Sequence, residues 1–222
     1  MTDQTQPLAL VTGASRGLGA ALAEALAARG YHIVAVARTT GGLEDLDDRI
    51  KAAGGSATLA PMDICDGSAM AHLCRSIHDR WGALNIWVHT AIHATSLTPA
   101  HHITEKDLDK CIETNIRAFS RLITYVDPLL RGGVAPGQAL FFDDIPGEKY
   151  HGTYALSKAA QRALIENWRA ESTTDGSPKI HFLSPPPMPT GTRARFHPGE
   201  DRDKLTNTRD VAERILSEEN IF

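Results

Sequence analysis

Tyr154 and Lys158 are the two side chains of this sequence best suited to proton transfer. They are four residues apart in a stretch, 152–172, whose apolar spacing predicts a helix, so both lie on one helix face. A free phenol has a pKa of about 10, and a nearby ammonium group lowers that pKa by favouring the phenolate. The spacing is common by chance, so its meaning depends on the motifs that precede it.

A glycine-rich turn near the N-terminus could hold a phosphate group. The segment TGASRGLG, residues 12–19, joins an apolar strand candidate at 8–12 to an alanine- and leucine-rich helix candidate at 17–29. The spacing G-x-x-x-G-x-G permits a tight turn and a close approach of the backbone to a ligand. The N–H groups and the positive dipole end of the following helix would then face the pyrophosphate of a dinucleotide. We expect contacts to that dinucleotide from Gly13, Ser15, Arg16, Gly17, Leu18 and Gly19.

Arginine side chains near this turn indicate which dinucleotide it holds. Proteins that prefer NAD place an acidic residue near the end of the second strand, where it accepts hydrogen bonds from the ribose 2′-hydroxyl. Here the second expected strand, 32–37, is followed by Arg38 instead of an acid. Arg16 can reach the same place from the turn, and two guanidinium groups can clamp a 2′-phosphate. The sequence therefore predicts NADP(H) as the cofactor.

The scaffold for these groups alternates strands with helices. Apolar runs separated by stretches of helical period predict a single α/β domain over residues 1–222, of Rossmann type, with a doubly wound parallel sheet of about six strands and three helices on each face. Ligands of such sheets bind at the carboxyl ends of the strands, where the proline-rich segment 184–198 is either a lid or a plain surface loop. The expected strands are 8–12, 32–37, 57–61, 85–89, 138–142 and 179–183, and the expected helices are 17–29, 43–53, 68–81, 104–130, 152–172 and 208–217.

Composition and charge argue against several other classes of protein. The chain has 222 residues and a net charge of −4, so no overall basic field predicts binding to nucleic acid or to an anionic membrane. The N-terminus lacks the features of a signal peptide, and no window reaches the roughly 18 apolar residues of a membrane span. Cys65, Cys74 and Cys111 show no CxxC spacing and are expected to be reduced thiols. These features predict a cytoplasmic protein that acts on a small-molecule substrate.

Four histidines, at positions 89, 93, 101 and 102, stand close together in the sequence. Carboxylate or cysteine ligands at matching spacing do not accompany them. We therefore expect solvated loop histidines and no metal site.

Several motifs, in order along nearly the whole chain, resemble those of the short-chain dehydrogenase/reductase family. TGASRGLG is similar to the family's cofactor turn, and YALSK, residues 154–158, matches its Y-x-x-x-K motif. Asp63 stands where the family places a carboxylate beside the adenine, and Asn115 matches its helix asparagine. Pro185 and Thr190 fit the P-G-x-x-x-T motif that follows the sixth strand. Within the family, the sequence is similar to a bacterial branch of largely uncharacterised reductases.

The resemblance implies a reaction in which a hydride moves between nicotinamide and a carbonyl or alcohol carbon while Tyr154 gives or takes the proton. Lys158 would lower the pKa of Tyr154 and hold the nicotinamide ribose, and Asn115 would hold a water that links Lys158 to solvent. The family likeness also implies a homodimer through the helices 104–130 and 152–172, with a tetramer as a further arrangement. Beyond the glycine turn, it implies cofactor contacts at Arg38, Asp63, Ile64, Ala91, Lys158, Pro185 and Thr190.

The sequence departs from the family where a serine should follow the fifth strand. Counting back from Gly147, that position falls on Asp144, and the loop from there to Tyr154 is shorter than usual. Asp144 could be a protonated hydrogen-bond donor, similar to the aspartate of the pteridine reductases in this family. It could instead bind a cationic or amide-like substrate. In a third interpretation, an ionised Asp144 disfavours the tyrosinate and weakens or abolishes the reaction.

Two other positions depart from the family beside the expected nicotinamide. The family's N-N-A-G after the fourth strand is HTAI here, residues 89–92, and the glycine of its P-G pair is Pro186. We expect an NADP(H)-dependent oxidoreductase acting on a small carbonyl or alcohol, with Tyr154, Lys158, Asn115 and Asp144 at its reaction centre. The alternatives are a pteridine-reductase-like activity and a catalytically degenerate NADP(H)-binding protein with a sensing or partner-binding role.

Overall fold

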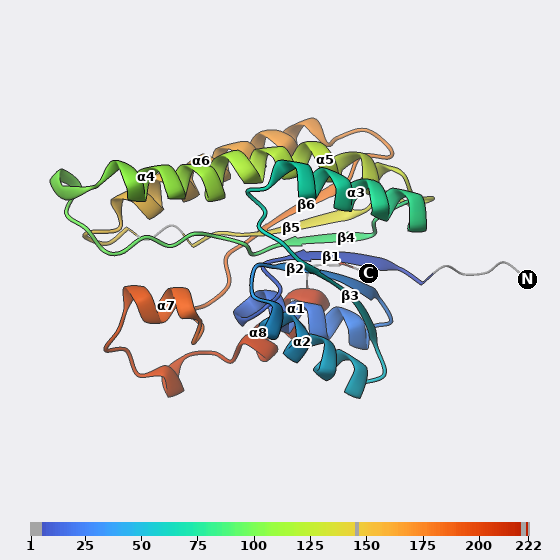
Figure 1. The fold of residues 1–222 in the computed structure, drawn as a ribbon, viewed down its shortest axis with the longest axis horizontal. Helices are drawn as coiled ribbons and strands as arrows, with labels where there is room; N and C mark the ends of the chain where they lie inside the picture. The colour runs from blue at the N-terminus through green and yellow to red at the C-terminus, as the bar shows by residue number, and fades with distance from the viewer. Residues whose placement is uncertain (1–5, 145–146, 219–220, 222) are drawn as a thin grey trace, which may run out of the picture.

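The computed structural model describes residues 6–144, 147–218 and 221, and a parallel sheet runs through its middle (Figure 1). Its strands are β1 (Leu8–Thr12), β2 (His32–Ala37), β3 (Ser56–Pro61), β4 (Ile86–His89), β5 (Gln138–Phe142) and β6 (Lys179–Leu183). They lie in the order β3–β2–β1–β4–β5–β6, and every neighbouring pair is parallel. The strand order reverses between β1 and β4, which places a ligand crevice at the carboxyl ends of these two strands.

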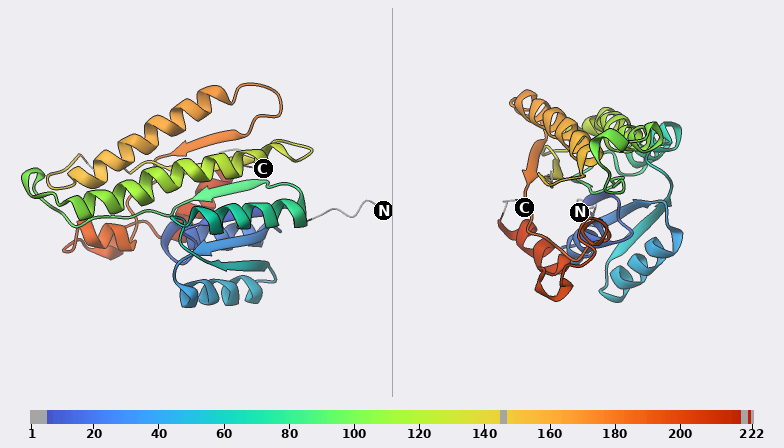
Figure 2. Two further views of the ribbon diagram at one scale, coloured as in Figure 1. Left: turned by 45° about the horizontal axis from the view of Figure 1, so that its top comes forward. Right: turned by 90° about the vertical axis from the view of Figure 1, so that its left-hand side faces the viewer.

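Helices cover both faces of the sheet and give the molecule three layers (Figures 1 and 2). They are α1 (Gly17–Ala28), α2 (Thr40–Ala52), α3 (Gly67–Trp81), α4 (Glu105–Ile112), α5 (Phe119–Arg131), α6 (Gly152–Glu171), α7 (Gly191–Phe196) and α8 (Thr208–Glu218), with short segments η1 (Ala100–His102), η2 (Glu113–Ala118) and η3 (Arg202–Lys204). α1, α2 and α8 lie against one face, and α3, α5 and α6 lie against the other. α4 continues into α5 through the π-helical segment η2. α7 lies outside these layers, beyond the carboxyl ends of the strands (Figure 1).

The sheet is apolar on both faces because helices cover both of them. β1 is buried at every residue. The core on the α1 side is rich in small alanine side chains, which leave room for α1 to contact α2 and α8. The core on the other side holds the large rings of Trp87, Phe119 and Phe141, whose centroids lie between 5.2 and 6.4 Å apart. These two cores fix the positions at which the strands end.

The predicted fold class, a doubly wound parallel sheet with helices on both faces, is confirmed. Thr104 caps α4, because the Asp107 N–H donates to Thr104 Oγ1 at 3.2 Å. The helix expected over 104–130 is in fact divided by the π-helical segment η2. The segment 184–198, expected to be a lid or a loop, contains α7, whose first turn is capped by Thr190 Oγ1 at 3.2 Å from the Arg193 N–H.

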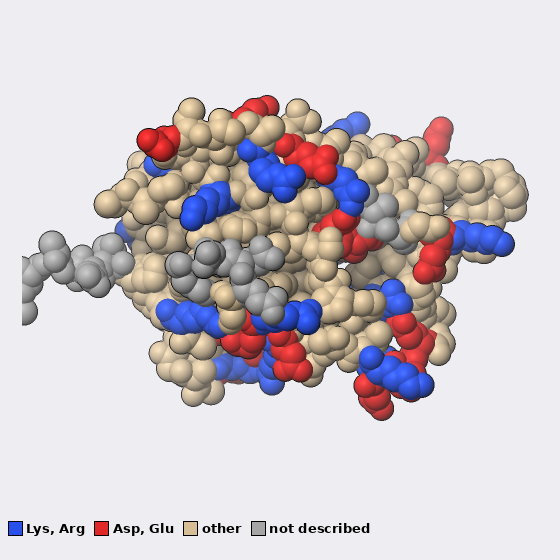
Figure 3. Space-filling view, turned by 180° about the vertical axis from the view of Figure 1, so that it is seen from behind, with Lys and Arg blue, Asp and Glu red and all other residues tan. Residues whose placement is uncertain are grey.

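Acidic and basic side chains are intermixed on the face of the molecule shown in Figure 3. No broad patch of one sign is visible on that face, in agreement with a net charge of only −4. Among the helices that the structure describes, none is long and apolar enough to cross a membrane.

Candidate active site

A cavity of about 250 Å³ opens at the carboxyl ends of β1 and β4, where the strand order reverses. Every residue for which the sequence predicts a cofactor contact lines it: Gly13, Ser15, Arg16, Gly17, Leu18, Gly19, Arg38, Asp63, Ile64, Ala91, Lys158, Pro185 and Thr190. Asp144 also lines this cavity, whereas Tyr154 and Asn115 are buried behind its wall. The topology of the sheet thus brings one predicted set of residues to one place.

The glycine turn forms a cradle that side chains would fill. Gly13 has a φ of +88°, and its N–H donates to the Val36 carbonyl at 2.9 Å. A Cβ on Gly13 would lie 2.6 Å from the Ala91 nitrogen, and a Cβ on Gly19 would lie 2.3 Å from Thr90 Oγ1. Both positions therefore require glycine. Since α1 begins without a side-chain cap, its first N–H groups remain available to a phosphate, and the cradle fits the pyrophosphate of a dinucleotide.

Two guanidinium groups stand at the rim of this cradle. The Arg38 side chain, which follows β2, is 66% exposed, and its Nη1 lies 3.7 Å from Asp63 Oδ2. Arg16 is exposed on the turn itself. A solvated ion pair of this length is weak, so an anion bound at the rim can compete with Asp63 for Arg38. The rim can therefore accept a phosphate group without breaking a buried contact.

Elsewhere in the lining of the cavity, the Asp144 carboxylate joins the two side chains that the sequence identified for proton transfer. α6 carries Tyr154 and Lys158 one turn apart on the same face. The Tyr154 hydroxyl donates to Asp144 Oδ2 at 2.5 Å, and Lys158 Nζ lies 3.0 Å from Asp144 Oδ1. Lys158 Nζ also donates to the Phe142 carbonyl at 2.9 Å, at the end of β5. The Asp144 carboxylate therefore occupies the hydrogen-bonding position that a substrate oxygen would need.

The surroundings of Tyr154 keep it protonated. Burial raises the pKa of Tyr154 above its ordinary value of 10, and the Asp144 carboxylate raises it further through its charge and its hydrogen bond. The lowering of this pKa that we expected from Lys158 is not found, and the Lys158 ammonium group is paired with Asp144 instead. Tyr154 is thus held as a neutral phenol, which is the form that can donate a proton.

α7 covers Tyr154 from the solvent side. The Tyr154 side chain is only 1% exposed, and its ring centroid lies 5.0 Å from that of Phe196 at the end of α7. The same Phe196 ring meets His151, just before α6, at 4.7 Å. From the sequence, the segment that contains α7 was expected to be either a lid or a plain surface loop, with no signal that Phe196 would contact Tyr154.

Asn115 lies in the π-helical segment η2 and is fully buried. Its Nδ2 donates to the His93 carbonyl and to Ser157 Oγ, both at 2.9 Å, and its Oδ1 accepts from the His93 N–H at 2.7 Å. The side chain thereby ties the loop after β4 to α6, which carries the reactive pair. Its role in holding a water near Lys158 stays a prediction.

Comparisons with known proteins agree with this geometry. The family model for short chain dehydrogenases matches residues 7–201 of the chain. The chain belongs to the short-chain dehydrogenase family. A relative from Nostoc, the ketoacyl reductase HetN, is 30% identical over 79% of this chain, which spans 62% of that protein. A Haemophilus influenzae protein named Probable NADP-dependent dehydrogenase is 29% identical over 87% of this chain and 77% of its own length.

Solved structures of short-chain dehydrogenases share the fold. A metagenomic short-chain oxidoreductase in complex with NADP superposes with a TM-score of 0.79 at 23% identity, covering 94% of this chain and 88% of that one. At this level of identity the likeness concerns the fold alone. The family membership makes this protein an oxidoreductase, while its substrate must be argued from its own residues.

One histidine in the lining of the cavity is more buried than the sequence suggested. His89, expected to be a solvated loop residue, is the last residue of β4 and only 5% exposed. Its Nδ1 lies 2.8 Å from Thr12 Oγ1, while its Nε2 has no hydrogen-bond partner among the described residues. Gln161 on α6 lines the same cavity, and its Nε2 is likewise buried without a described partner. Within the described part of the chain, the lining of the cavity therefore includes two buried, unpartnered polar atoms, His89 Nε2 and Gln161 Nε2, that the sequence did not indicate.

Replacing His89 with asparagine is expected to flatten the dependence of stability on pH. Burial and the nearby Lys158 ammonium lower the pKa of His89 from 6.5 to about 3. Between these values the unfolded chain binds a proton that the folded chain excludes, so the native protein loses up to about 1.4 kcal/mol for each unit by which the pH falls. Asparagine removes this contribution, and urea unfolding between about pH 4 and about pH 7 measures it. The exposed His72→Asn change should keep the wild-type slope; equal slopes for the wild type and His89→Asn would contradict a neutral, buried His89.

Proposed function

We propose that this protein is an NADP(H)-dependent oxidoreductase that transfers a hydride to or from a small carbonyl or alcohol substrate. One observation carries the proposal: the glycine cradle and the pair Asp144 and Lys158, whose carboxylate accepts from Tyr154, line one cavity. A cavity lined by both groups suits a dinucleotide whose pyrophosphate lies on the cradle and whose nicotinamide lies near Asp144 and Lys158.

The choice of the phosphorylated cofactor is supported by the charges at the rim. Arg16 and Arg38 both line the cavity, and Arg38 follows β2 where an acid would favour NAD. The Haemophilus relative is named as an NADP-dependent dehydrogenase and the metagenomic structure is a complex with NADP, and both point the same way. Together these features favour a 2′-phosphate at the rim.

When it is bound, the nicotinamide supplies or accepts the hydride at the substrate carbon. In the direction of reduction, the Tyr154 O–H gives its proton to the substrate oxygen, which completes the alcohol. The substrate oxygen must first replace Asp144 Oδ2 as the acceptor of this O–H group, because the carboxylate holds it at 2.5 Å. Lys158 remains beside Asp144 Oδ1 and keeps the released carboxylate paired. We propose that Asp144 stands in the family's serine position and that it slows the reduction of simple ketones.

The function is tested by following NADPH in two measurements on the purified full chain. Binding should enhance NADPH fluorescence, and a panel of aldehydes, ketones, quinones and pterins should contain substrates that oxidise NADPH. Binding without oxidation across the whole panel would contradict the proposed activity and would favour a protein that only holds the cofactor.

Replacing Arg38 with alanine is expected to shift the cofactor preference toward NADH. Removing a charge-assisted contact costs about 1.5–3 kcal/mol, so the ratio of kcat/KM for NADPH to that for NADH should fall about ten- to a hundredfold. Steady-state rates with both cofactors measure this ratio. Arg75→Ala, which removes an exposed arginine from α3, should leave it unchanged. A preference for NADH already present in the wild type, or an unchanged ratio in Arg38→Ala, would rule out the phosphate contact.

A further inference from the structure

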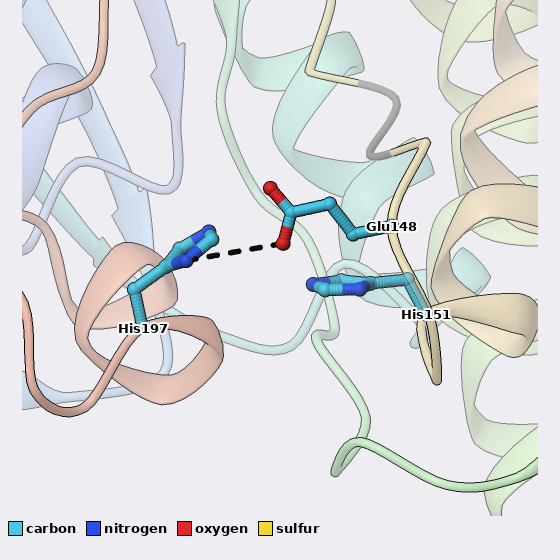
Figure 4. Close-up of side chains that lie close together, drawn as sticks. All are labelled: Glu148, His151 and His197. Carbon is cyan, nitrogen blue, oxygen red and sulfur yellow. Dashed lines mark ion pairs between the residues drawn. The ribbon is translucent and has the colours of Figure 1, made fainter.

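Glu148, His151 and His197 form a cluster of three potential metal ligands outside the cavity (Figure 4). Each residue offers one ligand atom, and these atoms all lie within 4.8 Å of one another. Glu148 and His151 stand just before α6, whereas His197 follows the last residue of α7. The cluster therefore bridges the loop that leads into α6, which carries Tyr154, and the end of α7, which covers Tyr154.

His151 is placed as a metal ligand would be. It is only 3% exposed, and its Nδ1 lies 3.0 Å from the Lys149 carbonyl. A carbonyl can only accept a hydrogen bond, so Nδ1 carries the proton and Nε2 carries the lone pair. In the part of the chain that the structure describes, Nε2 is buried and has no partner, which is a costly state for a polar atom. Figure 4 shows the ring extending toward the Glu148 carboxylate and His197.

The backbone before His151 is held in an uncommon conformation that fixes this direction. Tyr150 has a φ of +72°, in the left-handed region that side chains other than glycine rarely adopt. Its carbonyl accepts a hydrogen bond from the Thr98 N–H at 2.9 Å, which ties the loop to the segment after β4. The orientation of His151 thus depends on the surrounding fold as well as on its own rotamer.

The charges around Glu148 leave its carboxylate available. Its oxygen lies 4.0 Å from His197 Nδ1, and its side chain is 62% exposed. Arg193 on α7 interacts electrostatically with Glu148, but its guanidinium group is already hydrogen-bonded to Glu200 through two contacts of 2.5 and 2.6 Å. Glu148 can therefore approach a cation without giving up a strong ion pair.

We propose that Glu148, His151 and His197 bind a divalent transition-metal ion, with Zn²⁺ preferred, which fastens α7 over Tyr154. Two imidazole nitrogens and one carboxylate are a ligand set typical of zinc with an open fourth position, whereas Mg²⁺ and Ca²⁺ prefer oxygen ligands alone. Zinc bonds of about 2.0–2.1 Å place tetrahedral ligand atoms roughly 3.3 Å apart. The three ligand atoms lie within 4.8 Å of one another, and the oxygen of the exposed Glu148 is 4.0 Å from His197 Nδ1, so a shift of about one bond length brings them to this spacing.

The contacts of Phe196 explain why a metal bound at this place would hold α7 over Tyr154. Phe196 precedes His197 directly, and its ring packs on His151 at 4.7 Å and on Tyr154 at 5.0 Å. Arg195 of the same helix donates to the Ala94 carbonyl at 2.9 Å, and its side chain is otherwise exposed. A metal bond to His197 would add a strong link at the end of α7 beside these weaker contacts. This inference goes beyond the proposed oxidoreductase activity and does not depend on it.

The site is tested by titrating the chelator-treated full chain with Zn²⁺ by calorimetry and with Co²⁺ by visible absorption. We expect one ion for each chain and the intense absorption of four-coordinate Co²⁺. Glu148→Gln and His197→Gln should each weaken Zn²⁺ binding about tenfold or more, since each removes a ligand. His101→Gln, which changes an exposed histidine outside the cluster, should bind Zn²⁺ as the wild type does. Circular dichroism tests whether each variant is folded. A loss of Zn²⁺ affinity in both Glu148→Gln and His197→Gln guards against an effect of misfolding in either one alone.

A second readout tests the link to α7. Trypsin cleaves after Arg193 and Arg195, so Zn²⁺ should slow cleavage there in the wild type and in His101→Gln but not in His197→Gln. Equal Zn²⁺ affinity in the wild type and in both ligand variants would overturn the site, because surface histidines alone would then account for binding. Binding that depends on the three ligands but leaves the rate of cleavage unchanged would overturn the fastening of α7.

Discussion

Replacing Tyr154 with phenylalanine is expected to lower kcat for NADPH-dependent carbonyl reduction by about a hundred- to ten-thousandfold, the usual loss when a positioned proton donor is removed. The hydroxyl group is directed at Asp144 Oδ2, beside the ammonium group of Lys158. Phenylalanine keeps the ring that packs on Phe196, so the fold should persist. The partly exposed Asp144 carboxylate can exchange the lost hydrogen bond for one with water.

NADPH affinity separates a loss of chemistry from a loss of the site. Tyr154 lies behind the cavity wall, so the fluorescence titration with NADPH should be unchanged in Tyr154→Phe. Tyr150→Phe is the matched control, because it removes the same hydroxyl from an exposed ring nearby. Wild-type turnover in Tyr154→Phe would show that another group donates the proton. Weaker NADPH binding would show that Tyr154 supports the cofactor site instead.

The sheet could be predicted from the sequence because each strand is a continuous apolar run bounded by turn residues. The expected bounds of β1, β2, β5 and β6 agree with the structure residue for residue, and β3 and β4 differ by one residue at their first positions. Strand order then brings the turn after β1, Arg38 after β2 and Asp63 after β3 to a common edge. Residues far apart in the chain could thus be assigned to one cavity from topology together with the resemblance to the family.

Features that depend on contacts between elements could not be predicted in this way. α7 forms in a proline-rich segment because Thr190 caps its first turn and its last residue packs on Tyr154. The fourth strand was expected to end at His89, but the burial of this side chain was not, because the histidines that follow it in the sequence suggested exposure. The ligands of the proposed metal site come from two segments, before α6 and after α7, and no spacing motif connects them.

The glycine cradle could be predicted from the sequence more fully than the surroundings of Tyr154, because the cradle depends on local geometry and the surroundings of Tyr154 depend on contacts between elements. A cradle of glycines is specified by local backbone geometry, so the spacing of Gly13, Gly17 and Gly19 predicts it directly. The state of Tyr154 is set mainly by its burial and by the Asp144 carboxylate, both of which require the folded structure. The sequence could identify Asp144 as a departure, but its contact with both Tyr154 and Lys158 could only be seen in the fold.

Replacing Asp144 with serine is expected to raise kcat/KM for simple ketones about tenfold to a thousandfold. A carboxylate beside an ionisable group shifts its pKa by roughly 1–3 units, and each unit corresponds to a tenfold change in equilibrium. Removing it should lower the pKa of Tyr154 toward its ordinary value, free the Tyr154 O–H for the substrate oxygen and leave the charge of Lys158 uncompensated. The serine hydroxyl can also donate a hydrogen bond to that oxygen, which a carboxylate cannot do.

Asp143→Ser provides the control for this gain, since it makes the same chemical change one residue away. The Asp143 side chain pairs with Arg162 and has no contact with Tyr154 among those described, so its loss should not accelerate turnover. Initial rates with a short ketone series at saturating NADPH measure both variants. A fall in kcat/KM in Asp144→Ser would mean that the carboxylate itself takes part in the reaction, and the native substrate would then be a molecule that needs an acid beside Tyr154. A gain in kcat/KM confined to Asp144→Ser would show that the Asp144 carboxylate, through its hydrogen bond with Tyr154, limits the reduction of simple ketones.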